Sequence, residues 1–515
     1  MENTMPNPIN GKVGENRLVL CRALFFTFLL GLAAHGFQYL HLDPSHDYLM
    51  RLTLNTAVEG PVSRGRFLEP VYNLIMGPAS TLPWSAGLIS LLWLGLTVYA
   101  AARLFDLSGR KELFLLAAVL VVNRSMISLN AVYLPFAGVF SLSALTAVLA
   151  VYCWKKSSER RWYLGVGALL TAASLAMYQS YLFTSVTLIL LYSFYRLLKH
   201  DRAAAVIVNG LKSVAMLLVG CGIYMVSIRA ACRVTGIPLA EGDYNSLSNL
   251  WGNSESILDR LTACYTEVWE NLIVHPVSIW SGEAATALAL ALCAVTAVLL
   301  VLAVLREKIA LPEQIVGLLI LLVLPLGANG IRLLNNECHD LMHYAFWLLL
   351  LLPVLLLSVL GGKSVAAAKW SGAAACLLLC VLTFSNLQLA NLTYTQKEQE
   401  FEATRAVMIN VMERVEEQEG YVEGETPVAF LGTPESVLRP LKDKDKTDRI
   451  TGCYASSAIS YYHTYFSYFE NVLQRNTNVV LVSDELQSSP EAVAMPAYPA
   501  RGCVAAVDGT VVVKF

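Results

Sequence analysis

The chain has 515 residues, of which 56% are hydrophobic and 15% are charged. Ordinary soluble domains carry about 25% charged residues, so the composition excludes that class and indicates a membrane protein. The formal net charge of −2 gives no electrostatic reason to expect nucleic acid or another strongly charged polymer as a partner.

Long apolar segments recur along most of the chain, and a helix needs roughly 20 mainly apolar residues to cross a membrane. They predict about 11 transmembrane helices. The third and the fifth are the weakest, because polar residues interrupt or shorten them. The predicted spans lie near residues 18–40, 82–102, 112–129, 133–153, 162–178, 180–197, 212–230, 284–305, 312–328, 344–361 and 370–392.

Lysines and arginines gather in the short loops on one side of these spans, for example in segments 103–111 and 154–161. Positive charge marks the cytoplasmic side of a membrane protein, so the N-terminus is predicted inside and the C-terminus outside. The first apolar run is longer than that of a secretory signal and indicates an uncleaved anchor. We therefore expect a multi-pass protein of a bacterial inner membrane, with its outer loops in the periplasm.

The first outer loop, residues 41–81, concentrates charge between two apolar spans. Asp47 follows soon after the last apolar residue, Leu40, so its carboxylate is expected near the bilayer surface. A carboxylate at that level, with arginines nearby, can act on a substrate that arrives from the lipid. The charged residues and histidines around it are Asp43, His46, Arg51, Glu59, Arg64, Arg66 and Glu69.

The same loop also fits an ordinary surface helix. Asp43 before Pro44 has the form of an N-cap followed by a helix start. Residues 47, 51, 55 and 59 recur with the four-residue spacing of a solvated helix face. Gly60-Pro61 would end such a helix. The local pattern leaves both interpretations open.

Three further outer segments carry polar residues. Gln179 lies in a tight hairpin between the fifth and sixth spans, where it either caps the turn or reaches into a cavity. The second half of loop 231–283 has helical spacing and aromatic residues that suit a membrane interface. Loop 329–343 holds Arg332 and His343, which either contact phosphate or sugar or simply make the interface polar. No third ligand accompanies the histidines of this loop, so no metal site is expected.

From Tyr394 the chain becomes more polar, and residues 394–515 are predicted to form a small soluble α/β domain. Residues 395–419 have the spacing of a charged helix with one apolar face. Cys453 and Cys503 fall in this region, where a disulfide could persist. Short strands are predicted over residues 427–432, 478–483 and 510–515.

A many-span protein with an acidic first outer loop suits sugar transfer from a lipid carrier. A carboxylate near the membrane takes the proton from an acceptor hydroxyl, and that oxygen attacks the anomeric carbon of the donor sugar. The leaving group is a phosphate, and arginines or histidines stabilise its charge as the bond breaks.

Several stretches, taken in order, resemble the Gtr-type O-antigen glucosyltransferases, which are polytopic membrane enzymes of the GT-C kind. The resemblance implies a GT-C-like transmembrane domain over residues 1–393. It also implies transfer of glucose from undecaprenyl-phosphate glucose to lipopolysaccharide O-antigen, or a similar surface polysaccharide, on the periplasmic face. The matching stretches are HDYLMRLTLNTAVEGPVSRGRFLEPVYNLI, YLPFAGVFSLSAL, SLAMYQSYLFTSVTLILL and NLTYTQKEQEFEATRAVMINVMERVEE, the last followed by PVAFLGTP.

The resemblance places the family's first-loop acid at Asp47, which we expect to be the general base. The family often has two adjacent acids there, whereas this chain has His46-Asp47, so Asp43 or Glu69 could take the second role. No cofactor is expected. The predicted substrate-binding residues are Asp43, His46, Arg64, Arg66, Glu69, Gln179, Arg332 and His343.

The expected partners are the polyprenyl-phosphate sugar donor, a polysaccharide or lipid-linked oligosaccharide acceptor, membrane lipid, and membrane proteins that make and flip the donor. Two alternative functions use similar substrates. A flippase or transporter would need polar residues at mid-depth in the spans, whereas the ionisable residues here cluster at outer ends and loops. A polysaccharide polymerase shares the lipid substrate, and the soluble C-terminal domain argues weakly against it.

Overall fold

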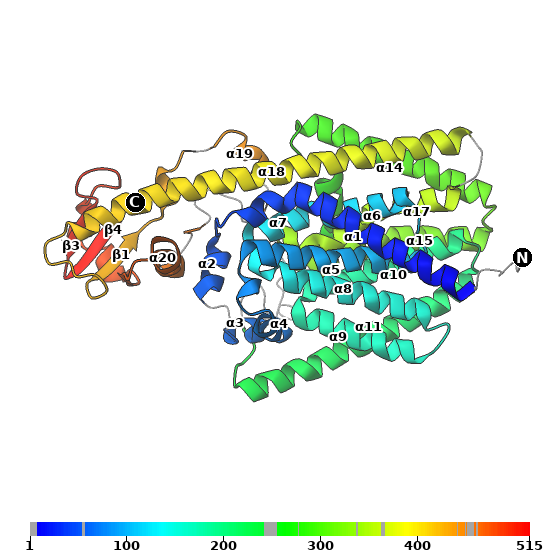
Figure 1. The fold of residues 1–515 in the computed structure, drawn as a ribbon, viewed down its shortest axis with the longest axis horizontal. Helices are drawn as coiled ribbons and strands as arrows, with labels where there is room; N and C mark the ends of the chain where they lie inside the picture. Colours follow the sequence, from blue (N-terminus) through cyan, green and yellow to red (C-terminus); the bar gives the residue numbers. More distant parts are fainter. Residues whose placement is uncertain are drawn as a thin grey trace, which may run out of the picture.

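A bundle of long apolar helices makes up most of the computed structural model, and a small α/β domain lies beyond one end of it (Figure 1). The longest helix, α18 (Ala366–Glu416), runs along the bundle and continues into that domain. The structure describes residues 8–53, 57–241, 255–274, 276, 278–335, 338–361, 366–439, 441–448, 450, 458–459 and 462–515.

In this described part of the chain, nine helices are long and apolar enough to cross a membrane. A tenth crossing results if α6 and α7, which meet at a bend of 48°, count as one broken span. The fifth predicted span corresponds to α9, whose 16 residues cover about 24 Å, less than the roughly 30 Å of a hydrocarbon core. The two predicted spans that polar residues weaken are therefore the ones that the structure breaks or shortens. The bundle contains α1 (Pro8–Leu40), α5 (Pro83–Leu104), α6 (Arg110–Val121), α7 (Arg124–Val132), α8 (Leu134–Lys156), α9 (Trp162–Met177), α10 (Leu182–Leu198), α11 (Ala203–Thr235), α14 (Gly282–Arg306), α15 (Leu311–Ala328), α16 (Tyr344–Trp347), α17 (Leu351–Leu360) and α18.

The bend between α6 and α7 has a local cause. The side-chain oxygen of Asn123 accepts a hydrogen bond from the amide of Met126 at 3.0 Å, which starts a new helix with an N-cap. Arg124, in the first turn of α7, then pairs with Asp340 at 2.8 Å. This ion pair holds the second half of the broken span against the segment that follows α15.

The first outer loop folds into three short helices at the end of the bundle nearest to the C-terminal domain (Figure 1). The single surface helix considered for this loop is wrong, because α2 begins at His46 and ends at Thr53. Gly60 and Pro61 lie in the first turn of α3, where the missing amide of proline costs no hydrogen bond. The loop contains α2 (His46–Thr53), α3 (Glu59–Ser63), α4 (Leu68–Met76) and η1 (Gly77–Ser80).

In the described parts of the later loops that are predicted to lie outside, short helices pack on the bundle. In α13 (Ile257–Trp269) the predicted helix of the 231–283 loop is present, and the thiol of its buried Cys264 lies 3.3 Å from the carbonyl oxygen of Asn329. The remaining short turns of the bundle are η2 (Gln179–Tyr181), η3 (Glu270–Val274), η4 (Gly330–Leu333), η5 (Asp340–His343) and η6 (Leu348–Leu350).

The C-terminal domain is built on a four-stranded sheet with the order β2-β1-β4-β3. Strand β1 pairs in parallel with β2 and β4, and β3 and β4 form an antiparallel hairpin. The predicted strands are present, although β2 has only two residues; β3 is not among the predicted strands. The elements are β1 (Pro427–Leu431), η7 (Pro434–Val437), α19 (Lys444–Thr447), α20 (Tyr462–Tyr468), η8 (Phe469–Leu473), β2 (Asn478–Val479), α21 (Asp484–Gln487), α22 (Pro490–Ala494), β3 (Val504–Val507) and β4 (Thr510–Lys514).

The second half of α18 supplies one wall of this domain's core. Its predicted apolar face is buried against the sheet, together with Leu49 of α2. On the sheet, the ring of Tyr465 stacks on Phe430 at a centroid distance of 4.1 Å. Because α18 continues through Tyr394, where the sequence places the domain boundary, one uninterrupted helix joins the two parts. Cys453, the predicted disulfide candidate, lies outside the described residues.

We predict that residue 157 and the C-terminus lie on opposite sides of the membrane. Ser157 follows α8 at the end remote from the first outer loop, within one of the basic loops that are predicted to lie inside. Reporter fusions after Ser157 and after Phe515, one active only inside and one only outside, should therefore give opposite results. Placement of both on one side would contradict the predicted topology.

Candidate active site

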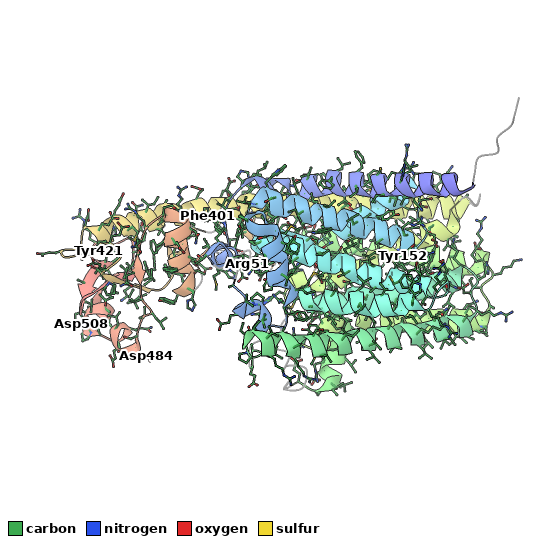
Figure 2. All side chains as sticks on the ribbon, turned by 60° about the horizontal axis from the view of Figure 1, so that its bottom comes forward. Arg51, Tyr152, Phe401, Tyr421, Asp484 and Asp508 are labelled. Atoms are coloured by element: carbon green, nitrogen blue, oxygen red, sulfur yellow. The ribbon has the colours of Figure 1, made fainter. Side chains whose placement is uncertain are left out.

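A cavity of about 220 Å³ lies where the first outer loop meets the ends of the bundle helices. One wall carries charge from α2, from the turn after α3 and from α4, and the other wall is aromatic. Figure 2 labels Arg51 of this cavity beside the C-terminal domain, whereas Tyr152 lies far along the bundle. The lining residues are Asp47, Met50, Arg51, Ala57, Gly60, Pro61, Arg64, Arg66, Glu69, Tyr133, Phe136, Phe140, Tyr178, His339, Leu341 and Met342.

Asp47 lies in the first turn of α2, where the helix dipole favours a negative charge. Its side chain is 34% exposed, and its carboxylate is 3.5 Å from Nε2 of His46. Within the described residues, Asp47 forms no ion pair with an arginine. Its carboxylate is therefore accessible from the cavity and able to accept a proton.

Arg51 and Glu69 form a buried ion pair across the cavity wall, with side-chain exposures of 6% and 1%. The guanidinium of Arg51 also lies 4.7 Å from the ring centre of Phe136. The interpretation of Arg51 as part of a solvated stripe is therefore wrong. Because Arg51 neutralises Glu69, this carboxylate shapes the wall and is less available than Asp47 as a base.

The turn that carries Arg64 and Arg66 is a Schellman motif at the end of α3. The amide of Gly65 donates to the carbonyl of Val62 at 2.9 Å, and the amide of Arg66 donates to Pro61 at 2.7 Å. Gly65 has a φ angle of +80°, a left-handed conformation that glycine adopts without strain. The glycine between the two arginines thus allows both side chains to line one cavity.

Gln179 supports this turn from outside the cavity lining. Its Nε2 donates to the carbonyl of Arg64 at 2.8 Å and to the hydroxyl of Tyr224 at 3.1 Å. That hydroxyl in turn donates to the carbonyl of Gly65 at 3.1 Å. Of the two roles considered for Gln179, these contacts favour the structural one.

Arg66 faces the aromatic wall. Its guanidinium centre lies 4.8 Å from the ring of Tyr178 and 5.6 Å from that of Phe140, and the two rings stack at 4.0 Å. Nε of Arg66 is buried and has no hydrogen-bond partner among the described residues. A guanidinium that is held by ring faces keeps its donors for an incoming anion.

The aromatic residues of this wall are not among the site residues predicted from the sequence, although the sequence contains a signal for them. Tyr133, Phe136 and Phe140 are spaced three and four residues apart and so fall on one face at the start of α8. Their spacing is also that of an ordinary core helix, and only the three-dimensional arrangement distinguishes a cavity wall from a helix face packed in the core.

Asp43 lies outside the cavity lining and does not cap α2. Its side chain is 2% exposed, accepts a hydrogen bond from Nε2 of Gln38 at 2.8 Å and pairs with Lys397 of α18 at 3.6 Å. Burial raises the pKa of the Asp43 carboxyl, and the charge of Lys397 acts in the opposite direction. Asp43 therefore ties the first outer loop to α18.

Arg332 and His343 are also absent from the cavity lining. Arg332 pairs with Glu267 at 2.8 Å and with Glu255 at 2.9 Å, and its hydrogen bond to Glu255 raises the pKa of the guanidinium. From the segment around η5, His339 lines the cavity instead of His343. No group of three or more metal-ligating side chains gathers in the described part of the chain.

The long apolar helices and the cavity at their end define a helical membrane protein with a polar, enzyme-like site. The glucosyl transferase GtrII family model matches residues 36–354, which is more than half of the chain, and the protein belongs to that family. It is therefore a glucosyltransferase. All residues that line the cavity fall within the matched range. No curated protein and no solved structure matches the chain.

We predict that breaking the Arg51–Glu69 pair destabilises the protein. Glu69→Gln or Arg51→Met leaves one buried charge unpaired, which should cost about 3–5 kcal/mol of unfolding free energy. The double change Arg51→Met/Glu69→Leu removes both charges and should recover much of that loss. Thermal unfolding of the purified protein in detergent measures the effect.

The control for this experiment is the exposed pair of Lys156 and Glu159. Removal of an exposed pair should cost only about 0–1 kcal/mol. Equal losses for the two pairs would show that the Arg51–Glu69 pair contributes no more than a surface contact.

Proposed function

We propose that the protein transfers glucose from a polyprenyl-phosphate donor to a surface polysaccharide, with Asp47 as the general base. The observation that carries this proposal is the convergence in one cavity of an accessible carboxylate, two arginines from a single turn and a stacked aromatic pair. Membership of the glucosyl transferase family supports the transfer of glucose.

A lipid-linked donor suits the position of the cavity. The cavity lies at the end of the apolar helices, so an anchored lipid can keep its chain in hydrocarbon while its phosphate reaches Arg64 and Arg66. Helix α4 supports this path: Glu69 lines the cavity, whereas Val71, Leu74 and Ile75 are exposed apolar side chains on the same helix. The planar fork of an arginine matches phosphate oxygens.

In the proposed reaction, Asp47 takes the proton from a hydroxyl of the acceptor sugar. The acceptor oxygen forms a bond to the anomeric carbon, and the bond from that carbon to the phosphate oxygen breaks. The electron pair leaves with the polyprenyl phosphate, whose charge Arg64 and Arg66 stabilise. The partly exposed rings of Tyr133 and Phe136, in the same aromatic wall, offer an apolar surface for the donor sugar.

The size of the cavity limits what it holds. Its volume of about 220 Å³ is below the roughly 300–1,000 Å³ of pockets for drug-sized ligands. It therefore suits one sugar ring beside a phosphate. Only the acceptor sugar that is modified would need to reach the cavity, and the rest of the polysaccharide would stay outside. The basic loops lie at the other end of the bundle, which supports a site on the periplasmic face of a bacterial inner membrane.

A test in detergent separates this function from lipid flipping. Purified protein, labelled polyprenyl-phosphate glucose and O-antigen should give labelled polysaccharide and free polyprenyl phosphate. A flippase makes no covalent product, and detergent micelles have no second membrane face. Absence of transfer from a folded protein that binds the donor would contradict the proposed reaction.

We predict that Asp47→Asn lowers transfer by about 10²–10⁴-fold, because a general base typically contributes that much to the rate. Asparagine keeps the size and the position in the first turn of α2, so the protein should still fold and bind the donor lipid. The matched control is Glu59→Gln, an exposed first-loop carboxylate outside the cavity lining, which should retain activity. Near-normal transfer by Asp47→Asn would remove Asp47 from the mechanism.

We predict that Arg66→Lys impairs transfer even though it keeps the charge. Lysine lacks the fork of donors that matches phosphate oxygens, and it lacks the flat guanidinium that packs on Tyr178. Arg66→Ala should lose about 10²-fold or more, as expected for removal of a group that stabilises developing negative charge. Arg229→Lys, an exposed change outside the cavity lining, is the control. If Arg66→Lys and Arg229→Lys behave alike, Arg66 does not grip the phosphate.

A further inference from the structure

A second and larger cavity lies at the opposite end of the bundle from Asp47. It has a volume of about 1280 Å³ and is lined by residues of α1, α6, α17 and α18. Its polar part lies at the first residues of α6 and near the start of α18, whereas the other end of α18 enters the C-terminal domain (Figure 1). None of its lining residues takes part in the candidate active site.

Charge and apolar surface are separated within this cavity. Arg110, Lys111 and Lys369 are exposed at its polar end, and in the described part of the chain none of them forms an ion pair or a hydrogen bond. Glu112 is the acidic residue of the lining and lies in the first turn of α6, where the helix dipole favours it. Three cations and one carboxylate leave a net positive end.

The remaining lining is almost entirely apolar, with Phe26, Phe114 and Leu357 among its side chains. On α18 the lining begins at Ala366, and the stretch from the charged Lys369 to the last lining residue, Cys380, covers about 16 Å at the helical rise. One leaflet of hydrocarbon is roughly 15 Å thick, half of a bilayer core. The cavity therefore has the depth of a single leaflet, with its charge at the surface end.

The cavity also borders the side of α18 that faces away from the bundle. Trp370 and Leu377 are 74% and 64% exposed, and within a helix long and apolar enough to cross a membrane such side chains face lipid. A lipid molecule can thus reach the cavity from the bilayer.

We propose that this cavity binds an anionic glycerophospholipid, with its phosphate at Arg110, Lys111 and Lys369 and its acyl chains along α6, α17 and α18. Basic pockets between transmembrane helices on the cytoplasmic side suit anionic head groups, and the apolar depth excludes a free phosphate ion as the preferred ligand. A lipid that binds only the folded protein stabilises it, here by filling the space between α18 and the bundle.

The first test measures lipid that remains bound to the full chain after purification in detergent. Protein incubated with equal amounts of phosphatidylglycerol and phosphatidylcholine should retain mainly phosphatidylglycerol, as detected by mass spectrometry. The triple variant Arg110→Gln/Lys111→Gln/Lys369→Gln should retain about tenfold less or lower, since each cation near a lipid head group contributes to binding. The control Arg160→Gln/Arg161→Gln/Lys212→Gln changes three exposed cations from the predicted inner loops that do not line the cavity, and it should bind like the original chain. Equal retention by both triple variants, or of both lipids, would overturn the proposal.

The second test leaves the charges in place and fills the cavity. Ala373 is an exposed lining residue of α18, so Ala373→Trp should obstruct the part of the cavity beside α18 without displacing a packed core. Phosphatidylglycerol should raise the melting temperature of the original chain and of Leu377→Trp, an exposed change outside the lining, but not of Ala373→Trp. An equal rise in Ala373→Trp would show that the lipid binds elsewhere.

Discussion

Leu49 and Arg51 lie two positions apart on α2 and are buried in different parts of the molecule. Leu49 belongs to the core of the C-terminal domain, whereas Arg51 pairs with Glu69 in the wall of the cavity. Thr53 adds a hydrogen bond from Asn471 at 2.7 Å. These contacts fix α2 on two sides, and the position of Asp47 in its first turn depends on both. The C-terminal domain therefore helps to hold in place the helix that carries Asp47, although none of its described residues lines the cavity.

This arrangement gives the C-terminal domain a role that the family match alone does not suggest. The match ends at residue 354, and the sheet and its covering helices lie beyond it. Lys397 of α18 nevertheless contacts Asp43 in the first outer loop, so the segment after the last apolar span supports the loop at the start of the family range. The two parts of the chain are joined by α18 and again through α2.

Much of the architecture could be predicted from local patterns. Apolar length identifies the spanning helices, and the spacing of Phe401, Met408 and Val411 identifies the buried face of α18. The first-loop residues Asp47, Arg64, Arg66 and Glu69 do line one cavity, as their density in a single loop suggests. Helix ends, by contrast, depend on individual caps such as Asn123, and these change the count of spans.

The remaining features depend on distant partners. Arg51 has the spacing of a solvated residue, and nothing in its local sequence shows that it will be buried in an ion pair with Glu69. Asp43 has the form of an N-cap, but Lys397 holds it elsewhere. The hairpin of β3 and β4 is different, because its turn, Asp508-Gly509, has positive φ angles of 48° and 78°. Asp-Gly is a common sequence for such two-residue turns, so β3 could have been predicted from the sequence.

Because α18 is one continuous helix, the rotation of the C-terminal domain about the helix axis is fixed relative to the bundle. Each residue of an α-helix turns the chain by about 100°. One added or missing residue between the last apolar turn and Phe401 would therefore rotate the second half of α18, together with the sheet that packs on it, around the helix axis and away from Leu49 of α2. A change of seven residues is close to two full turns and would mainly alter the distance between the C-terminal domain and the bundle. We therefore expect this segment to tolerate changes of whole helical turns better than changes of a single residue.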